Sequence, residues 1–414
     1  MATPTENTPS NGTRSEAEYQ QILSTPPKQT DKDQRAFESA LIGLGSLYRD
    51  QKRTSDLHTL TTQTLQNLST FPKAKISKIV RQLLDLYIKI PNSLDAYIGV
   101  TRECIAWAVA QRQGFLRQNL EVRLVGLLMR KGEYYDALTL INGLLKELKR
   151  LDDKLVLVEV QLLESKVYHA LGNVPKGRAA LTSARTSAAS VYTPPLLQAG
   201  LDMQSGQLHA EDGDFNTAFS YFIEAMEGYH TQDLAAQATS ALQYMLLCKI
   251  MLNAKDEVDA LTTSKQALKY AGPRLDAMKS IARAHSNRSL EEYESALHTY
   301  RPQLASDTFI SSHLRRLYDS MLTQNLIKVI EPFSRVEIAH VALMVGLDVA
   351  QVERKLSQMI LDRVIVGVLD QGAGVLVVFE EQERDEGYEA ALETIEKLGG
   401  VVDALYVNQA GLLE

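Results

Sequence analysis

A repeat of about forty residues constrains the fold of this chain more than any other feature of its sequence. Turn-forming breaks recur at positions 50, 91, 132, 172, 213 and 253, so that successive breaks lie 40 or 41 residues apart. Apolar runs with helical spacing flank each break. A fixed period in this range, with one helix pair per unit, is typical of an α-solenoid. The alternative is an ordinary helical bundle, which would need five coincidental spacings in succession.

Small residues follow several of these breaks at one fixed distance. Ala137, Gly177 and Ala218 each lie five residues after the glycine of a break. A small side chain at that position lets two helices approach closely across a tight turn. The sequence therefore predicts a mainly α protein that contains a right-handed α-solenoid of tetratricopeptide-like helix pairs. Because solenoids present long concave surfaces to other proteins, we expect this part to be a scaffold.

Composition argues against several classes of protein. The formal net charge is −7, whereas binding nucleic acid through bulk charge needs clustered cations. The two cysteines, Cys104 and Cys248, lie too far apart in the sequence for a disulfide framework and favour a reducing compartment. No apolar run approaches the roughly 18 residues of a membrane helix, and the N-terminus lacks a signal-peptide pattern. We expect a protein of the cytoplasm and nucleus with no membrane partner.

The pattern changes near residue 300. A long helix is predicted over residues 311–330, and Pro332 ends it. Ser334 and Glu337 have the spacing of a capping box, which predicts that the next helix begins directly after Ser334. Gly346 ends that helix, and Asp348 is placed to cap another. Two helices joined by a short turn that contains glycine form a helix-turn-helix.

A β-hairpin is predicted directly after this helix pair. Two runs rich in β-branched residues, 364–369 and 375–379, flank the glycine-rich turn at 370–374. A helix-turn-helix followed by a hairpin is the order of a winged helix. The expected domains are a disordered tail at 1–15, the solenoid at 16–300, the winged helix at 301–381 and a C-terminal helical tail at 382–414.

The tail at 382–414 carries an apolar stripe at helical spacing, which Gly399 and Gly400 interrupt. Its members are Tyr388, Leu392, Ile395, Leu398 and Val402, with Leu405 and Tyr406 beyond. A terminal helix of this kind either folds back on its own domain or inserts into a bundle formed with partners. The sequence leaves both possibilities open.

No catalytic constellation is found. Residues 172–179 have the glycine spacing of a phosphate-binding loop, but Arg178 and Ala179 replace the lysine and the hydroxyl that such a loop requires. The eight histidines are scattered and show no zinc-binding spacing. We expect no enzyme activity, no catalytic residue, no cofactor, no metal and no small-molecule ligand.

The winged helix raises a nucleic-acid alternative, because a recognition helix can enter a major groove. Residues 331–363 contain four Lys or Arg against five Asp or Glu, and the hairpin turn has no cation to meet a phosphate. This balance favours protein contact, with the hairpin as an edge for intermolecular strand pairing and with no nucleic-acid partner. A winged-helix nucleic-acid-binding adaptor is the alternative function of another class.

The order of solenoid, winged helix and terminal helix resembles the PCI family. That family supplies scaffold subunits to the proteasome lid, the COP9 signalosome and a translation initiation factor complex. Five segments are similar to the proteasome-lid branch of the family: residues 267–272, 284–290, 330–335, 352–362 and 367–374. With the solenoid included, the resemblance covers nearly the whole chain apart from residues 1–15.

The resemblance implies a non-catalytic structural subunit of the 26S proteasome regulatory particle lid. Such a subunit braces the lid, the ATPase ring and the core particle for ubiquitin-dependent protein degradation. Its partners would be other PCI subunits of the lid, the ATPase ring and the α subunits of the core particle, which the repeats at 35–130 would face. A PCI scaffold subunit of the COP9 signalosome is the alternative within the family.

The resemblance also implies two sets of partner-binding residues. The hairpin would form the edge at which PCI domains pair, through Val364, Ile365, Val366, Val368, Val375, Val377 and Phe379. The terminal helix would join a shared bundle through the stripe of Tyr388, Leu392, Ile395 and Leu398.

Overall fold

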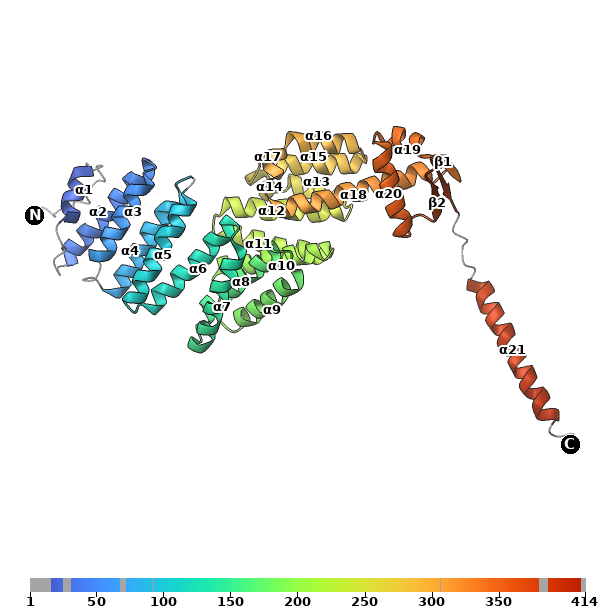
Figure 1. The fold of residues 1–414 in the computed structure, drawn as a ribbon, viewed down its shortest axis with the longest axis horizontal. Helices are drawn as coiled ribbons and strands as arrows, with labels where there is room; N and C mark the ends of the chain where they lie inside the picture. Colours follow the sequence, from blue (N-terminus) through green and yellow to red (C-terminus); the bar gives the residue numbers. More distant parts are fainter. Residues whose placement is uncertain are drawn as a thin grey trace, which may run out of the picture. The chain divides into compact units, whose positions relative to one another are not determined.

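The computed structural model describes residues 16–24, 31–67, 72–91, 93–305, 307–379 and 386–410. These residues form helices and one small sheet (Figure 1), and the chain divides into two compact units, Met1–Met278 and Lys279–Glu414. The predicted disordered tail at 1–15 lies outside the described residues.

The first unit is a succession of antiparallel helices. In its first half these are α1 (Glu16–Ser24), α2 (Asp31–Asp50), α3 (Thr54–Asn67), α4 (Lys73–Ile88), α5 (Leu94–Ala110), α6 (Gly114–Lys131) and α7 (Tyr134–Leu151). In its second half they are α8 (Lys154–Ala170), α9 (Val174–Ala189), α10 (Pro195–Glu211), α11 (Phe215–Thr231), α12 (Ala235–Met251), α13 (Lys255–Thr263) and α14 (Lys265–Lys269). Helix α15 (Pro273–Asn287) spans the boundary between the units.

Each helix of this unit packs mainly against helices one or two places away in the chain, as in the successive contacts from α5 through α12. Contacts restricted to near neighbours are the defining property of a solenoid. The predicted helical solenoid is therefore confirmed.

Residues with left-handed backbone conformation mark the turns between these helices. They recur about every twenty residues, at Arg112, Gly132, Asp152, Gly172, Gly213, Asp233 and Asn253. At the one missing position, near residue 193, the chain instead enters α10 through Pro194 and Pro195. The forty-residue period is thus two helices of similar length, each with its own turn. The sequence pattern showed only every second turn, at Gly132, Gly172, Gly213 and Asn253, whereas Arg112, Asp152 and Asp233 mark turns between them.

Small residues allow the predicted close approach of paired helices. A Cβ atom added to Gly177 on α9 would lie 3.4 Å from the Ser165 carbonyl oxygen and 3.6 Å from the His169 amide nitrogen, both on α8. Ala137 and Ala218, at the equivalent positions, are fully buried. The backbones therefore come together where the sequence places its smallest side chains.

The second unit begins with helices and ends in a small sheet and a long helix. Its helices are α16 (Leu290–Thr299), α17 (Arg301–Leu304), α18 (Thr308–Ile330), α19 (Ile338–Val345), α20 (Val349–Leu361) and α21 (Glu386–Ala410). The strands are β1 (Arg335–Glu337), β2 (Gly367–Asp370) and β3 (Val375–Val378). Both strand pairs are antiparallel, and the order in the sheet is β1-β3-β2. Helices α19 and α20 with the β2–β3 hairpin form the predicted winged helix.

The predicted capping box at Ser334 is wrong. Residues 335–337 form β1, which pairs with β3, and α19 begins at Ile338 with Glu337 at its N-cap. The Val378 amide donates to the Ser334 carbonyl at 2.9 Å, and the Ile338 amide donates to the Gly374 carbonyl at the same distance. Pairing with β3 satisfies backbone groups of both strands, which outweighs a local cap.

The turn of the hairpin is held by Asp370. Its carboxylate accepts from the amides of Gly372 at 3.0 Å and Ala373 at 3.1 Å, and Gly374 adopts a φ of +66°. An aspartate that bonds to amides two and three residues ahead pre-forms a turn. The aspartate of the glycine-rich hairpin turn therefore has a structural role within this chain.

Candidate partner-binding surfaces

Among the described residues, β2 is one of the two edge strands of the sheet, and β1 is the other. Strand β3 lies in the centre, with β1 on one side and β2 on the other, so the backbone groups of Val375 and Val377 face strands of this chain. Of the predicted hairpin residues, Val368 lies on β2, and Val364, Ile365 and Val366 precede that strand. An added strand can therefore pair at β2 but not at β3.

One face of the hairpin is apolar and exposed. Val368 lies opposite Val377, and the Phe379 amide donates to the Val366 carbonyl at 2.8 Å, which continues the pairing by one step. Alternation along each strand then places Val366, Val368, Val377 and Phe379 on the same face. The exposed fractions are 43% for Val366, 54% for Val368 and 50% for Phe379.

The remaining hairpin residues differ in exposure. Val364 is 49% exposed, Ile365 is half-buried, and Val375 is buried at 8%. Leu376 is fully buried and lies opposite both Val336 and Leu369. The sheet therefore has one face in the core and one apolar face that is open to solvent. Val375 is not among the exposed residues of that open face.

Helix α21 carries the second predicted surface. Leu392, Ile395 and Leu398 have at least half of their surface exposed, at 50%, 65% and 58%. Tyr388 lies within the helix, but its side chain is outside those that the structure describes. The stripe continues to Val402, Leu405 and Tyr406, which are each 57–77% exposed. Gly399 and Gly400 lie inside the continuous helix and do not interrupt it.

Both cysteines in the described ranges are buried, and neither belongs to a metal-binding cluster. No group of three or more His, Cys, Asp or Glu there could hold a metal ion. Burial raises the pKa of both Cys104 and Cys248 to about 12, so each remains a neutral thiol and a poor nucleophile. No helix within these ranges is long and apolar enough to cross a membrane.

The segment with phosphate-loop spacing is the turn between α8 and α9. Gly172 adopts the left-handed conformation there, and the Asn173 side chain accepts from the Lys176 amide at the start of α9. Arg178 forms an ion pair with Asp212. These residues form the turn, cap the next helix and pair with a neighbouring helix end, as expected for an inter-helix turn.

Comparison with known proteins identifies the family. Three family models match in order along the chain: the 26S proteasome regulatory subunit RPN6 N-terminal domain over residues 2–131, the PCI domain over 292–380, and the 26S proteasome subunit RPN6 C-terminal helix domain over 384–410. A Schizosaccharomyces pombe protein, "Probable 26S proteasome regulatory subunit rpn6", is 51% identical over 395 residues, which cover 95% of this chain and 94% of that protein. The chain belongs to the RPN6 family of 26S proteasome regulatory subunits.

Other RPN6-family relatives show the same coverage. An Arabidopsis thaliana protein named "26S proteasome non-ATPase regulatory subunit 11 homolog" is 48% identical over 95% of this chain and 93% of its own length. The Saccharomyces cerevisiae "26S proteasome regulatory subunit RPN6" is 44% identical over 91% of this chain and 88% of its own length. The expected membership of the PCI family is confirmed.

The RPN6-family matches coincide with the surfaces described above. The PCI match contains the whole sheet, and the C-terminal helix match contains α21. The N-terminal match covers α1 to α6. Sequence reasoning missed β1, although the polar–apolar–polar alternation of Arg335, Val336 and Glu337 was a signal for a short strand. In the structure only the valine of the three is buried.

Proposed function

We propose that this protein is a non-catalytic structural subunit of the lid of the 26S proteasome regulatory particle. In this role it braces the lid, the ATPase ring and the core particle during ubiquitin-dependent protein degradation. The observation that carries the proposal is the 51% identity to a relative named as a 26S proteasome regulatory subunit, over nearly the full length of both chains.

The free edge of β2 is the proposed site of pairing with other PCI subunits of the lid. Its backbone groups are unpaired on one side within the described chain, and the apolar face beside it carries Val366, Val368 and Phe379. A strand added at this edge would gain backbone hydrogen bonds and cover apolar surface together. Val375 and Val377 support this edge from the central strand.

Helix α21 is the proposed contribution to a bundle of terminal helices. A stripe from Leu392 to Tyr406 exposes large apolar side chains, whereas the opposite face carries Glu393 and Lys397, which form an ion pair at 2.6 Å. A two-faced helix of this kind gains stability by burying its apolar face against other helices. Tyr388 is proposed to extend the same stripe.

The repeats at 35–130 are proposed to face the α subunits of the core particle, and the chain is proposed to act in the cytoplasm and nucleus. We further propose that it is no enzyme and needs no cofactor. The name of the Arabidopsis relative, which calls it a non-ATPase regulatory subunit, supports this proposal as far as ATPase activity is concerned.

The relatives' names favour a proteasome subunit over a PCI subunit of the COP9 signalosome. The acidic balance of residues 331–363 also disfavours a nucleic-acid adaptor, because a groove-reading helix needs cations. Affinity purification of the tagged chain from its own cells, with mass spectrometry and a peptidase assay, distinguishes these functions. Co-purification of ATPases, core-particle subunits and ATP-dependent peptidase activity is expected, and a signalosome set or chromatin without peptidase would contradict the proposal.

The proposed pairing edge is tested by Val368→Asp, which places a carboxylate on β2 itself. Recovery of other lid subunits should fall about tenfold, because a buried unpaired charge is strongly unfavourable at an interface. Leu196→Asp is the matched control: Leu196 is 47% exposed in the first turn of α10, where an acid suits the helix dipole. Equal loss from both variants would contradict a specific role for β2.

The bundle helix is tested by Leu398→Asp against Lys397→Gln. Both changes lower the net charge by one, but Lys397 lies on the polar face beside Glu393. Only Leu398→Asp should weaken incorporation into the lid, since only that residue lies on the apolar stripe. If both variants assemble normally, α21 does not bind through this face.

A further inference from the structure

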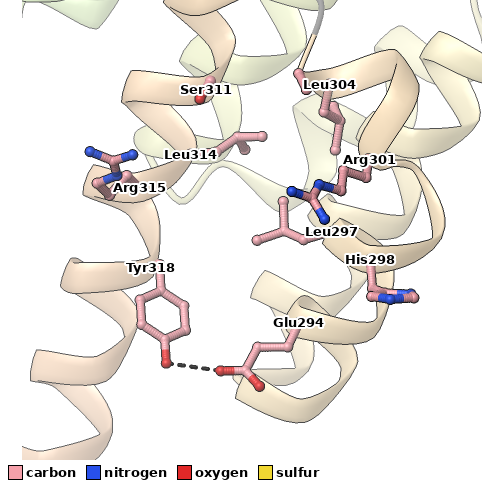
Figure 2. A pocket seen from close by; sticks show the side chains of 10 residues that line it. Glu294, Leu297, His298, Arg301, Leu304, Ser311, Leu314, Arg315 and Tyr318 are labelled. Atoms are coloured by element: carbon pink, nitrogen blue, oxygen red, sulfur yellow. Dashed lines mark hydrogen bonds between the residues drawn. The ribbon is translucent and has the colours of Figure 1, made fainter. Parts of the chain in front are cut away.

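The second unit contains a recess that neither proposed surface uses. It lies between α16 and α17 on one side and α18 on the other, with a volume of about 530 Å³ (Figure 2). Recesses of several hundred Å³ are large enough to accept a ligand side chain or a small ligand.

The interior of the recess is apolar. Figure 2 shows Leu297, Leu304 and Leu314 directed into the gap from the two walls. Leu304 and Leu314 are nearly fully buried, at 4% and 3% exposed, and Leu297 is half-buried. The Tyr293 hydroxyl donates to the Leu314 carbonyl at 2.7 Å and ties α16 to α18 beneath the recess. The walls are therefore held in place without an occupant.

The polar groups of the rim have an excess of positive charge. Arg301 and Arg315 lie on opposite walls, both exposed, with the Arg301 guanidinium extending into the gap (Figure 2). Glu294 is the single carboxylate of the lining, and it accepts from the Tyr318 hydroxyl at 3.0 Å. Within the described ranges, neither arginine has a carboxylate within ion-pair distance. The recess thus presents the Arg301 guanidinium over its leucine side chains, whereas the Arg315 guanidinium points away from the gap (Figure 2).

We propose that this recess binds a peptide segment of a partner protein that carries a glutamate or aspartate one helical turn from a leucine or a similar apolar residue. The apolar side chain would enter among Leu297, Leu304 and Leu314, and the carboxylate would accept from the guanidinium of Arg301. Charge complementarity identifies this occupant, because an arginine fork matches the geometry of a carboxylate.

The openness of the site favours a peptide over a free small molecule. Pockets for small ligands enclose most of the ligand surface, whereas His298, Arg301, Ser311 and Arg315 of this lining are all exposed. An open recess suits a side chain delivered by a longer chain that makes further contacts outside it.

Fluorescence anisotropy on the full chain tests the proposal. The probe is a fluorescein-labelled helical 14-residue peptide of alanine and glutamine, with one glutamate four residues before a leucine. Binding should be saturable and should weaken about tenfold on Arg301→Gln, since a charge-assisted hydrogen bond is lost. Leu297→Ser should weaken binding because it removes an apolar contact in the recess. Replacing the probe's glutamate by glutamine should weaken binding as much as Arg301→Gln does.

The control variant is Arg354→Gln, which removes the same charge from an exposed arginine of the same unit on α20. It should change binding less than twofold. A charge exchange makes the test sharper: a probe with lysine in place of glutamate should prefer Arg301→Glu to the unaltered chain.

Three outcomes would overturn the proposal. The first is equal weakening by Arg301→Gln and Arg354→Gln, which would mean that only net charge matters. The second is no saturable binding of the probe below about 1 mM. The third is binding of octanoate, a free carboxylate with an apolar chain, without binding of the peptide.

Discussion

Replacing Gly206 by alanine should loosen the solenoid at one defined helix pair. Gly206 lies on α10, and a Cβ atom built there would stand 2.6 Å from Cε1 and 2.8 Å from Cδ1 of Phe222 on α11. Phe222 is fully buried, and its ring packs against Tyr244 with ring centroids 5.3 Å apart. The ring therefore cannot move away without disturbing a second contact.

The magnitude follows from two opposing effects. Overpacking a core by one methyl group costs about 1–3 kcal/mol, whereas alanine is favoured over glycine inside a helix by about 1 kcal/mol. We expect a net destabilisation of up to about 2 kcal/mol at Gly206. Gly143→Ala on α7 is the control, because no atom lies within 4 Å of its added Cβ, and this variant should be stabilised by up to about 1 kcal/mol.

Native-state hydrogen exchange is the suitable assay, since a solenoid with near-neighbour contacts does not unfold in one step. Amides of α10 and α11 should exchange up to roughly 30-fold faster in Gly206→Ala, whereas amides of α5 should not change. Phe222→Leu should lower the free energy of unfolding less in the Gly206→Ala variant than in the unaltered chain, because it removes the ring that the added Cβ meets. If Gly206→Ala is as stable as Gly143→Ala, the packing argument is wrong.

Other predictions concern buried groups and the terminal helix. Cys104 and Cys248, whose pKa burial raises to about 12, should resist iodoacetamide at pH 8 until the chain is unfolded, as mass spectrometry would show. Because the thiols of the unfolded chain lose their protons first, the same pKa shifts predict that the free energy of unfolding falls as pH rises above about 9 towards 12. A free energy of unfolding from urea titrations that stays constant over this pH range would contradict this. Tyr293→Phe removes a buried hydrogen bond to the Leu314 carbonyl and should cost about 1–2 kcal/mol, read as faster exchange in α16 and α18. In the isolated chain, residues 388–398 should show little exchange protection, because a lone amphipathic helix is marginal in water; strong protection there would refute this.

Regular local patterns explain which parts of the fold could be predicted. The helix pairs follow from apolar spacing and from turns marked by Gly132, Gly172 and Gly213, and the hairpin follows from two β-branched runs around a glycine turn. The turn at Arg112 escaped prediction because arginine rarely adopts the left-handed conformation, whereas aspartate tolerates it, so Asp152 was a weak turn signal that went unused.

The partner-binding residues could likewise be predicted only in part. The sequence alone identified Val368 and Leu398 as apolar residues on a strand and a helix, and the structure shows both exposed. It could not show that Val375 and Val377 lie on the central strand, because that depends on β1, which is 40 residues away in the chain. Strand order is decided by pairing between distant segments, and no local pattern encodes it.

The sequence by itself determined the helical repeat, the winged-helix order and the family, because all three rest on residue types at short, regular spacings. Only the tertiary structure decided which strands lie at the edges of the sheet, where glycine must remain for a neighbouring ring, and which cation overlooks an apolar recess. Those features depend on atoms brought together from separate helices and strands. Burial and contact between such atoms exist only once the chain has folded.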